Sequence, residues 1–208
     1  MLVHLGMTGK LHVEPDTDFN PEELHKHIHA VVRLTGGKRI IFTDPRTFGK
    51  LAVQRELPFI EKMGPEPIDA DFDAEAIVQK LKKKAVRIKA AILDQGLVAG
   101  LGNIYADEVC FLAKVHPETR ACDISLEKLR ELVSYMKPVL EKAIAARGAT
   151  LKDGGYQDTF GEYGQFIPQI YGRKGDPCDN CGQTIQRGTL GLGKSARSYH
   201  FCPDCQKI

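Results

Sequence analysis

The sequence predicts an α+β protein of several domains, with a β-rich first part, a helical middle part and a C-terminal zinc ribbon. Three observations support this fold class. Short apolar runs separated by glycine turns fill the first part, apolar residues then recur at helical spacing, and two Cys-x-x-Cys pairs lie near the C-terminus. We expect three segments, at residues 1–63, 72–150 and 151–208.

Composition and charge limit the classes of function. The 208 residues are 42% hydrophobic and 27% charged, as in an ordinary globular protein with a real core. No apolar run reaches about 18 residues, which argues against a membrane span. The first ten residues do not follow a signal-peptide pattern, so a cytoplasmic protein is expected. The net charge of +2 is uninformative.

Basic side chains nevertheless gather in two places, residues 82–89 and residues 173–197. A single charged run is usually a solvated helix face. Two basic clusters beside a cysteine motif favour a polyanionic partner.

The β-rich part begins at once, because residues 2–5 have the pattern of a strand that enters a turn at Thr8 and Gly9. Residues 30–43 predict two strands joined by a two-residue turn, Gly36–Gly37, where glycine tolerates positive φ. TDPRTFG is a turn and KLAVQ a further strand.

The segment MGPEPIDADFD breaks this pattern and predicts a linker at the domain boundary. A helix follows it, capped by Asp71 or Asp73. Its apolar side comprises Phe72, Ile77 and Leu81.

Three further helices are expected in the middle part. They are a short helix at residues 88–93, one that begins at Asn103, and one long helix over residues 125–148. The long helix carries an apolar core stripe, should bend at Pro138 and should stop at Gly148.

The cysteine segment is the most specific motif. Cys178, Cys181, Cys202 and Cys205 form two Cys-x-x-Cys pairs separated by twenty residues. This spacing predicts one structural Zn²⁺ held by four thiolates, in preference to disulfides or a redox pair. The hairpin between the pairs carries Lys194 and Arg197 and no acidic residue, which suits phosphate contact. A ribbon used only for protein contact is the alternative.

The stretch GLVAGLGNIYADE predicts a tight turn followed by a helix with Asn103 as N-cap. Glycines before a helix N-terminus let an anion approach unpaired N–H groups. We therefore expect phosphate binding there, with an ordinary capped turn as the alternative.

Taken together, these motifs resemble the bacterial formamidopyrimidine-DNA glycosylase family. The resemblance rests on HLGMTG, KHIH, TDPRTFG, GLVAGLGNIYADE, YGRKGDPC and the cysteine hairpin, in that order along nearly the whole chain. HLGMTG and DPRTFG are more similar to the purine-specific branch than to endonuclease VIII. The resemblance implies an N-terminal β-sandwich, a helix–two-turn–helix domain and a zinc finger.

The implied function is base excision repair. Such a glycosylase and AP lyase flips oxidised purines, 8-oxoguanine or formamidopyrimidine, out of duplex DNA and excises them. The implied partner is double-stranded DNA with an oxidised purine or abasic site. We expect a monomer in the bacterial cytoplasm, with the nucleoid and no membrane partner.

The resemblance also assigns residue roles. Met7, Arg46 and Phe48 match a wedge that unstacks the bases and fills the hole. The positions that match DNA contacts are His27, Arg46, Lys84, Asn103 and Arg197. Arg197 would also act in the lyase step, and the loop after Lys152 would cover the extruded base. Without the resemblance, Met7 and Phe48 would be assigned to the core.

The family's catalytic opening is not found in this sequence. In the family a PELPE segment supplies a proline amine as nucleophile and a glutamate as general acid, and a lysine precedes HLGMTG. We therefore expect a fragment of a working glycosylase. The alternatives are an inactive protein that binds damaged DNA, and an unrelated zinc-ribbon nucleic-acid protein.

Overall fold

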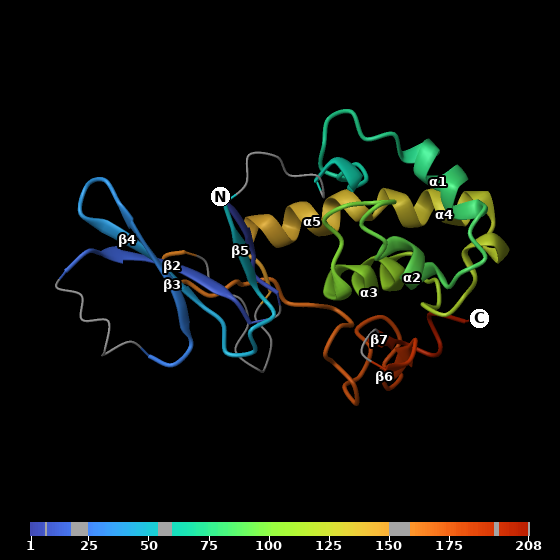
Figure 1. Cartoon of the computed structure of the whole chain (residues 1–208). Coiled ribbons are helices and arrows are strands. Elements are labelled where there is room, and N and C mark those ends of the chain that lie inside the picture. Colours follow the sequence, from blue (N-terminus) through green and yellow to red (C-terminus); the bar gives the residue numbers. More distant parts are fainter. Residues whose placement is uncertain (7, 18–24, 54–59, 150–158, 194–195, 208) are drawn as a thin grey trace. The chain divides into compact units, whose positions relative to one another are not determined.

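The structure is a computed structural model that describes all residues except 7, 18–24, 54–59, 150–158, 194–195 and 208 (Figure 1). The wedge candidate Met7 and the hairpin residue Lys194 lie outside the described residues. The chain forms two compact units. Unit 1 comprises Met1–Pro58 and Ala146–Phe166, and unit 2 comprises Phe59–Ala145 and Ile167–Ile208. The three expected sequence segments stay a prediction.

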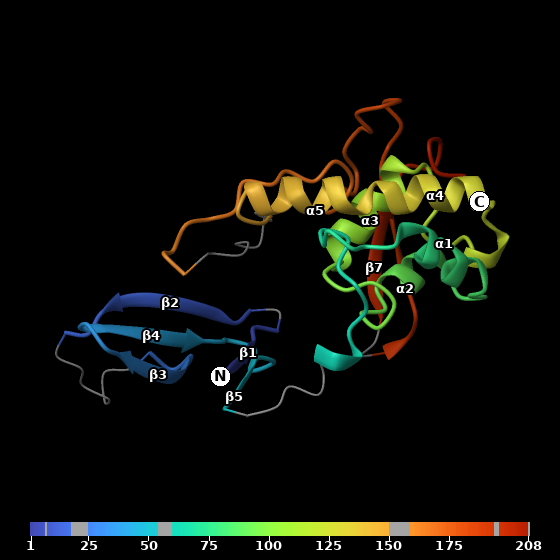
Figure 2. The same cartoon turned by 90° about the horizontal axis from the view of Figure 1, so that it is seen from above.

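The described part of unit 1 is built from two small antiparallel sheets. One pairs β1 (Leu2–His4) with β5 (Lys50–Ala52). The other has the order β2 (Lys10–Pro15), β4 (Lys38–Thr43), β3 (Ile28–Leu34), as Figure 2 shows. The central strand β4 supplies the buried apolar residues Ile41 and Phe42. The first residues of the chain are thus a paired strand, as expected.

The hairpin between β3 and β4 differs from the prediction by one residue. Leu34 pairs with Lys38, so the loop has three residues, Thr35 to Gly37. Gly36 and Gly37 have φ values of +92° and +71°, a region that suits glycine. The sequence identified the glycines but could not identify the last paired residue, which depends on strand register.

Unit 2 contains five α-helices in its described part, packed around one apolar core. They are α1 (Ala74–Lys82), α2 (Ile88–Ile92), α3 (Asn103–Leu112), α4 (Leu126–Ser134) and α5 (Met136–Ala145). Two 3₁₀ turns accompany them, η2 (Ile60–Lys62) and η3 (Ala121–Asp123). Asp73 caps α1 by accepting a hydrogen bond from the Ala76 amide at 2.9 Å, so Asp73 and not Asp71 is the cap.

The expected long helix is divided in two. Helix α4 ends at Ser134 and α5 begins at Met136, with Tyr135 between them. Pro138 has no N–H to donate to the Ser134 carbonyl, and its ring would crowd that carbonyl. It therefore occupies the first turn of α5, where no intrahelical N–H donor is required.

The C-terminal hairpin pairs β6 (Gln186–Leu190) with β7 (Arg197–Phe201). Residues directly before β6 and after β7 belong to a second apolar cluster, which includes Phe111 of α3. The other buried members are Ile170, Cys178, Ile185 and Cys202. The cysteine segment is thus joined to α3 by packing. In the described part of the chain, no helix has the length and apolar character needed to cross a membrane.

Candidate nucleic-acid interface

In unit 1 the TDPRTFG turn is organised by one buried carboxylate. Asp44 is 1% exposed, and it accepts hydrogen bonds from the Thr8 hydroxyl and from the Gly49 amide. The Arg46 amide also donates to it, at 3.3 Å. These hydrogen bonds, led by that of Thr8, lower the pKa of Asp44, so the carboxylate is ionised at neutral pH. We call residues 44–49 the Asp44 loop.

The Asp44 loop also has backbone and steric restraints. The Asp44 amide donates to the His27 carbonyl at 2.9 Å, and a ring nitrogen of His29 lies 2.8 Å from the Asp44 carbonyl. A Cβ at Gly49 would lie 2.6 Å from the Phe42 ring, so only glycine fits there. The loop and the KHIH segment are therefore held together, although the two motifs are far apart in the sequence.

The Asp44 loop presents Arg46 and Phe48 at the surface. Phe48 is 55% exposed, and the Arg46 guanidinium carbon lies 5.5 Å from its ring centroid, within cation–π distance. Thr47 between them has a φ of +56°, which is unusual for a β-branched residue. Phe48 is thus not a core residue. An exposed aromatic ring on a tightly anchored loop suits insertion into a base stack.

His27 lies beside this loop and is partly buried. Burial and the neighbouring charges of Lys26, His25 and His29 lower its pKa. His27 is therefore largely neutral at pH 7, and a bound phosphate would have to raise its pKa to gain a charge-assisted hydrogen bond.

In unit 2 the turn before α3 differs from the expected capped turn. The N-cap is Gly102, which offers no side-chain cap, and Asn103 is the first helical residue. The side-chain amide nitrogen of Asn103 donates to the Tyr171 hydroxyl at 3.3 Å, so it does not cap the helix. Neither the N-cap Gly102 nor the Asn103 amide nitrogen therefore caps α3, and the N-terminus of a helix with glycines before it is an arrangement that can receive an anion.

Helix α3 also fixes the segment that carries Tyr171. The carboxylate of Glu108 accepts three backbone hydrogen bonds, from Gln169, Ile170 and Tyr171, at 2.8 to 3.0 Å. Burial nevertheless raises the pKa of Glu108. Sequence reasoning missed both Glu108 and Tyr171. Glu108 could have been found from the sequence, because it is the acidic residue that ends the motif GNIYADE.

A second buried contact joins α2, α3 and the hairpin. Lys89 and Asp107 are fully buried, and their charged atoms lie 2.6 Å apart. The other Asp107 oxygen accepts from the His200 amide and lies 3.1 Å from the His200 ring nitrogen. Lys89 also donates to the Ser198 carbonyl at 2.7 Å. This Lys89–Asp107–His200 network holds β7, the strand that begins at Arg197, against α3.

Several basic side chains of residues 82–89 already have partners within unit 2, and their predicted contact with DNA stays a prediction. Lys82 donates to the Cys122 and Ile124 carbonyls, and Lys84 lies 3.0 Å from Asp94. Arg87 pairs with Glu118. With Lys89 buried as well, most of this charge is neutralised inside unit 2. A phosphate at Lys84 would have to compete with Asp94.

Arg197 is placed differently. It is exposed, and its guanidinium donates only to the carbonyl of its neighbour Ala196 among the described contacts. Its positive charge is therefore available to a phosphate.

The four motif cysteines meet in one place. Their sulfur atoms all lie within 4.8 Å of one another, with Cys181 and Cys202 at 3.4 Å and Cys178 and Cys205 at 4.0 Å. A tetrahedral Zn²⁺ with Zn–S bonds of about 2.3 Å needs sulfurs roughly 3.8 Å apart. The donor set and spacing therefore fit one structural Zn²⁺ whose four ligands all come from the protein, as predicted.

Family models cover most of the chain. The formamidopyrimidine-DNA glycosylase N-terminal domain matches residues 1–51, and its H2TH domain matches residues 63–154. A zinc finger found in FPG and IleRS matches residues 175–208. The chain is 41% identical over 212 residues to formamidopyrimidine-DNA glycosylase of Desulfitobacterium hafniense, covering 99% of this chain and 74% of that protein. The chain belongs to the formamidopyrimidine-DNA glycosylase family.

The solved structures of this family agree. The MutM (FPG) protein of Thermus thermophilus matches with a TM-score of 0.84 at 37% identity, over 98% of this chain and 74% of that one. The Lactococcus lactis Fpg in complex with DNA that contains an abasic site matches with a TM-score of 0.84 at 34% identity, over 99% of this chain and 74% of that one. The resemblance inferred from the motifs is confirmed, as are the fold class and the zinc site. The family is a family of enzymes.

Proposed function

We propose that this protein recognises duplex DNA that contains an oxidised purine or an abasic site. We further propose that it acts in base excision repair as a glycosylase and AP lyase. The Lactococcus lactis relatives include complexes with DNA that contains Fapy-dG and an abasic site. The observation that carries the proposal is the Asp44 loop, which holds the exposed Phe48 ring under the Arg46 guanidinium.

The chemistry of base extrusion explains why such a loop is needed. Taking a base out of the stack costs a few kcal/mol, and side chains that fill the gap offset part of that cost. Phe48 would enter the base step and Arg46 would fill the space beside the unpaired base. A flexible loop would lose conformational entropy on binding, which would cancel part of this gain in free energy. The Asp44 carboxylate fixes the loop before DNA binds, so this entropy cost is smaller.

Unit 2 would supply the phosphate contacts. The N-terminus of α3 and the exposed Arg197 guanidinium would supply donors for phosphate oxygens. Zn²⁺ would stabilise the hairpin that carries Arg197, and it has no part in the chemical step because its four ligands are all protein thiolates.

Binding is tested with duplexes that contain 8-oxoguanine or no lesion, with 2-aminopurine beside the lesion to report unstacking. Phe48→Ala should reduce lesion preference by about tenfold, the value of one or two kcal/mol of stacking. Leu34→Ala, another exposed apolar residue of unit 1 outside the loop, is the matched control. Equal lesion preference in Phe48→Ala and the parent protein would contradict the proposal.

Chemistry is tested separately by borohydride trapping on an abasic-site duplex. A covalent adduct that is lost when the Met1 amine is blocked shows that the 208 residues carry an amine nucleophile. Lesion-selective binding without an adduct shows that these residues recognise the lesion and do not cut, which is the second candidate function.

A further inference from the structure

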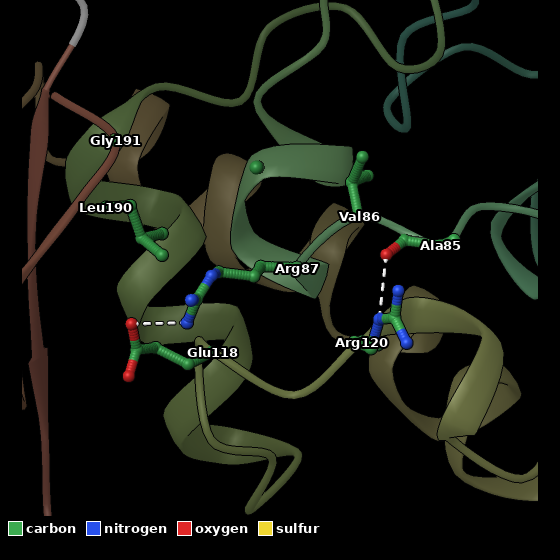
Figure 3. Close-up of a pocket in the computed structure, with 8 residues that line it drawn as sticks. Ala85, Val86, Arg87, Glu118, Arg120, Leu190 and Gly191 are labelled. Carbon is green, nitrogen blue, oxygen red and sulfur yellow. Dashed lines mark hydrogen bonds and ion pairs between the residues drawn. The ribbon is translucent and has the colours of Figure 1, made fainter.

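Unit 2 contains a hollow that none of the DNA-contact candidates lines. Its volume is about 430 Å³, within the range of small-ligand sites. It is lined by Ala85, Val86, Arg87, Ala90, Glu118, Arg120, Leu190 and Gly191. Figure 3 shows the two arginines together with the hairpin residues Leu190 and Gly191.

The walls of this hollow are fixed by backbone pairing. The segment that carries Arg87 runs antiparallel to the segment that carries Arg120, and these two residues form a β-bridge. The Ala121 amide donates to the Val86 carbonyl at 2.9 Å. The side chain of Arg120 donates through Nε to the Ala85 carbonyl at 3.2 Å. The hollow is therefore preformed.

The charges of the hollow leave one cation without a counter-ion. Glu118 pairs with Arg87, as the dashed line in Figure 3 shows. Arg120 has no carboxylate partner among the described residues, and its two terminal nitrogens are not engaged by the Ala85 contact. A guanidinium with both terminal nitrogens free binds a planar carboxylate through two parallel hydrogen bonds.

The rest of the lining is apolar. Leu190 is 6% exposed and forms a floor, while Val86 is 50% exposed and stands at the rim. Ala85, Ala90 and Gly191 add no charge. A DNA phosphate would pair with Arg120 but would leave this apolar surface unused. A ligand with one carboxylate beside a branched apolar group would use both parts.

We propose that this hollow is a docking site for a protein partner that presents an aspartate or glutamate next to a leucine-like side chain. The carboxylate pairs with Arg120, and the apolar side chain packs on Val86, Ala90 and Leu190. The peptide backbone of such a segment also covers the open rim, which a free small acid would leave in water. This docking site is independent of the proposed DNA function, because neither Arg120 nor Val86 is among the residues proposed to contact DNA.

The probe is the peptide acetyl-Leu-Asp-N-methylamide, titrated to about 10 mM because so small a ligand binds weakly. Nitrogen–proton correlation NMR on the 208-residue chain should show saturable shifts at the Val86, Ala90 and Gly191 amides. Acetyl-Leu-Asn-N-methylamide, which lacks the charge, should bind about tenfold more weakly. Absence of saturable shifts with the aspartate peptide would overturn the proposal.

Variants identify the contact. Arg120→Gln should weaken binding of the aspartate peptide by about tenfold, and Arg120→Lys should lie between, since a lysine keeps the charge but not the planar fork. Arg130→Gln removes another exposed arginine of unit 2 and should have no effect. Equal binding by Arg120→Gln and Arg130→Gln would refute the role of Arg120. Displacement of the peptide by an undamaged duplex would identify the hollow as a DNA contact and overturn the proposal.

Discussion

Single residues in this protein differ in how free their charges are. Lys84 and Arg197 were both expected to contact DNA, yet Lys84 lies 3.0 Å from Asp94 while Arg197 is exposed without an acidic partner among the described residues. A cation that already has a carboxylate gains less from a phosphate, because the first pair must be broken or shared. Two basic residues that look equivalent in the sequence therefore differ in how readily they can donate hydrogen bonds to a phosphate.

Arg197→Ala should weaken binding to duplex DNA at low salt by about tenfold and reduce the salt slope by about one. Lys84→Ala should have a smaller effect on both quantities, because Asp94 already neutralises part of its charge. Fluorescence anisotropy at several salt concentrations measures both. A larger loss of affinity for Lys84→Ala than for Arg197→Ala would show that the Lys84–Asp94 pair opens on binding.

His27 should make the affinity for DNA depend on pH. Its pKa lies below the ordinary histidine value of 6.5 in the free protein, and a phosphate contact would raise it in the complex. Binding would then take up a proton, so the affinity for DNA should rise as the pH falls below about 6.5. The rise should be smaller in His27→Gln than in His12→Gln, a control on β2. Identical pH profiles for the two variants would exclude His27 as the proton acceptor.

At the scale of elements, buried polar contacts join parts of unit 2 that are distant in the sequence. Glu108 fixes the segment at residues 169–171, and the Lys89–Asp107–His200 network fixes β7. Both carboxylates lie on α3, on the helix whose N-terminus is the anion-binding candidate. One helix thus sets the positions of its own N-terminal turn, of Tyr171 and of the strand that begins at Arg197.

Lys89→Met should destabilise unit 2 by about 3 kcal/mol, because it leaves the Asp107 charge buried without its cation. The double change Lys89→Met with Asp107→Asn should recover part of this loss, since the uncompensated charge is then gone. Lys80→Met on the exposed face of α1 is the control. Chemical denaturation measures all three. A double variant no more stable than Lys89→Met would show that the charge of Asp107 is not the cause.

At the scale of the whole molecule, the two units depend on different stabilising devices. Unit 1 is formed by two small sheets with few buried residues, and unit 2 has a larger helical core together with the cysteine site. The cysteine segment has little regular structure apart from β6 and β7 and relies on four thiolates and the cluster around Phe111. Its folding should therefore depend on the metal.

Cys202→Ser, or removal of Zn²⁺ by a chelator, should unfold the cysteine segment and weaken DNA binding through the loss of an ordered Arg197. Metal analysis should give one zinc per chain in the parent protein and much less in the variant. Amide hydrogen exchange should increase in residues 175–207 and remain low in α4. Retained stoichiometric zinc in Cys202→Ser would contradict the four-thiolate site.

The sequence by itself determined the local features of this protein. An aspartate cap before α1, glycines at the turn between β3 and β4, and four thiolates at zinc spacing each depend on residues close together in the chain or on a metal with fixed demands. The order of the motifs was also enough to identify the family. These features can be predicted without knowledge of the packing, because turn propensity, helix capping and the spacing of metal ligands are local properties of the sequence.

Only the tertiary structure decided which charges are free and which residues hold the sites. It joined Asp44 to Thr8 and His27, buried Lys89 beside Asp107, paired Lys84 with Asp94, and left Arg120 without an acid among the described residues. It also moved the α3 cap from Asn103 to Gly102 because Asn103 contacts Tyr171 instead. The physical reason is common to all of them. The free energy of a charged or polar group depends on its burial and its partners, and those partners lie far away along the chain.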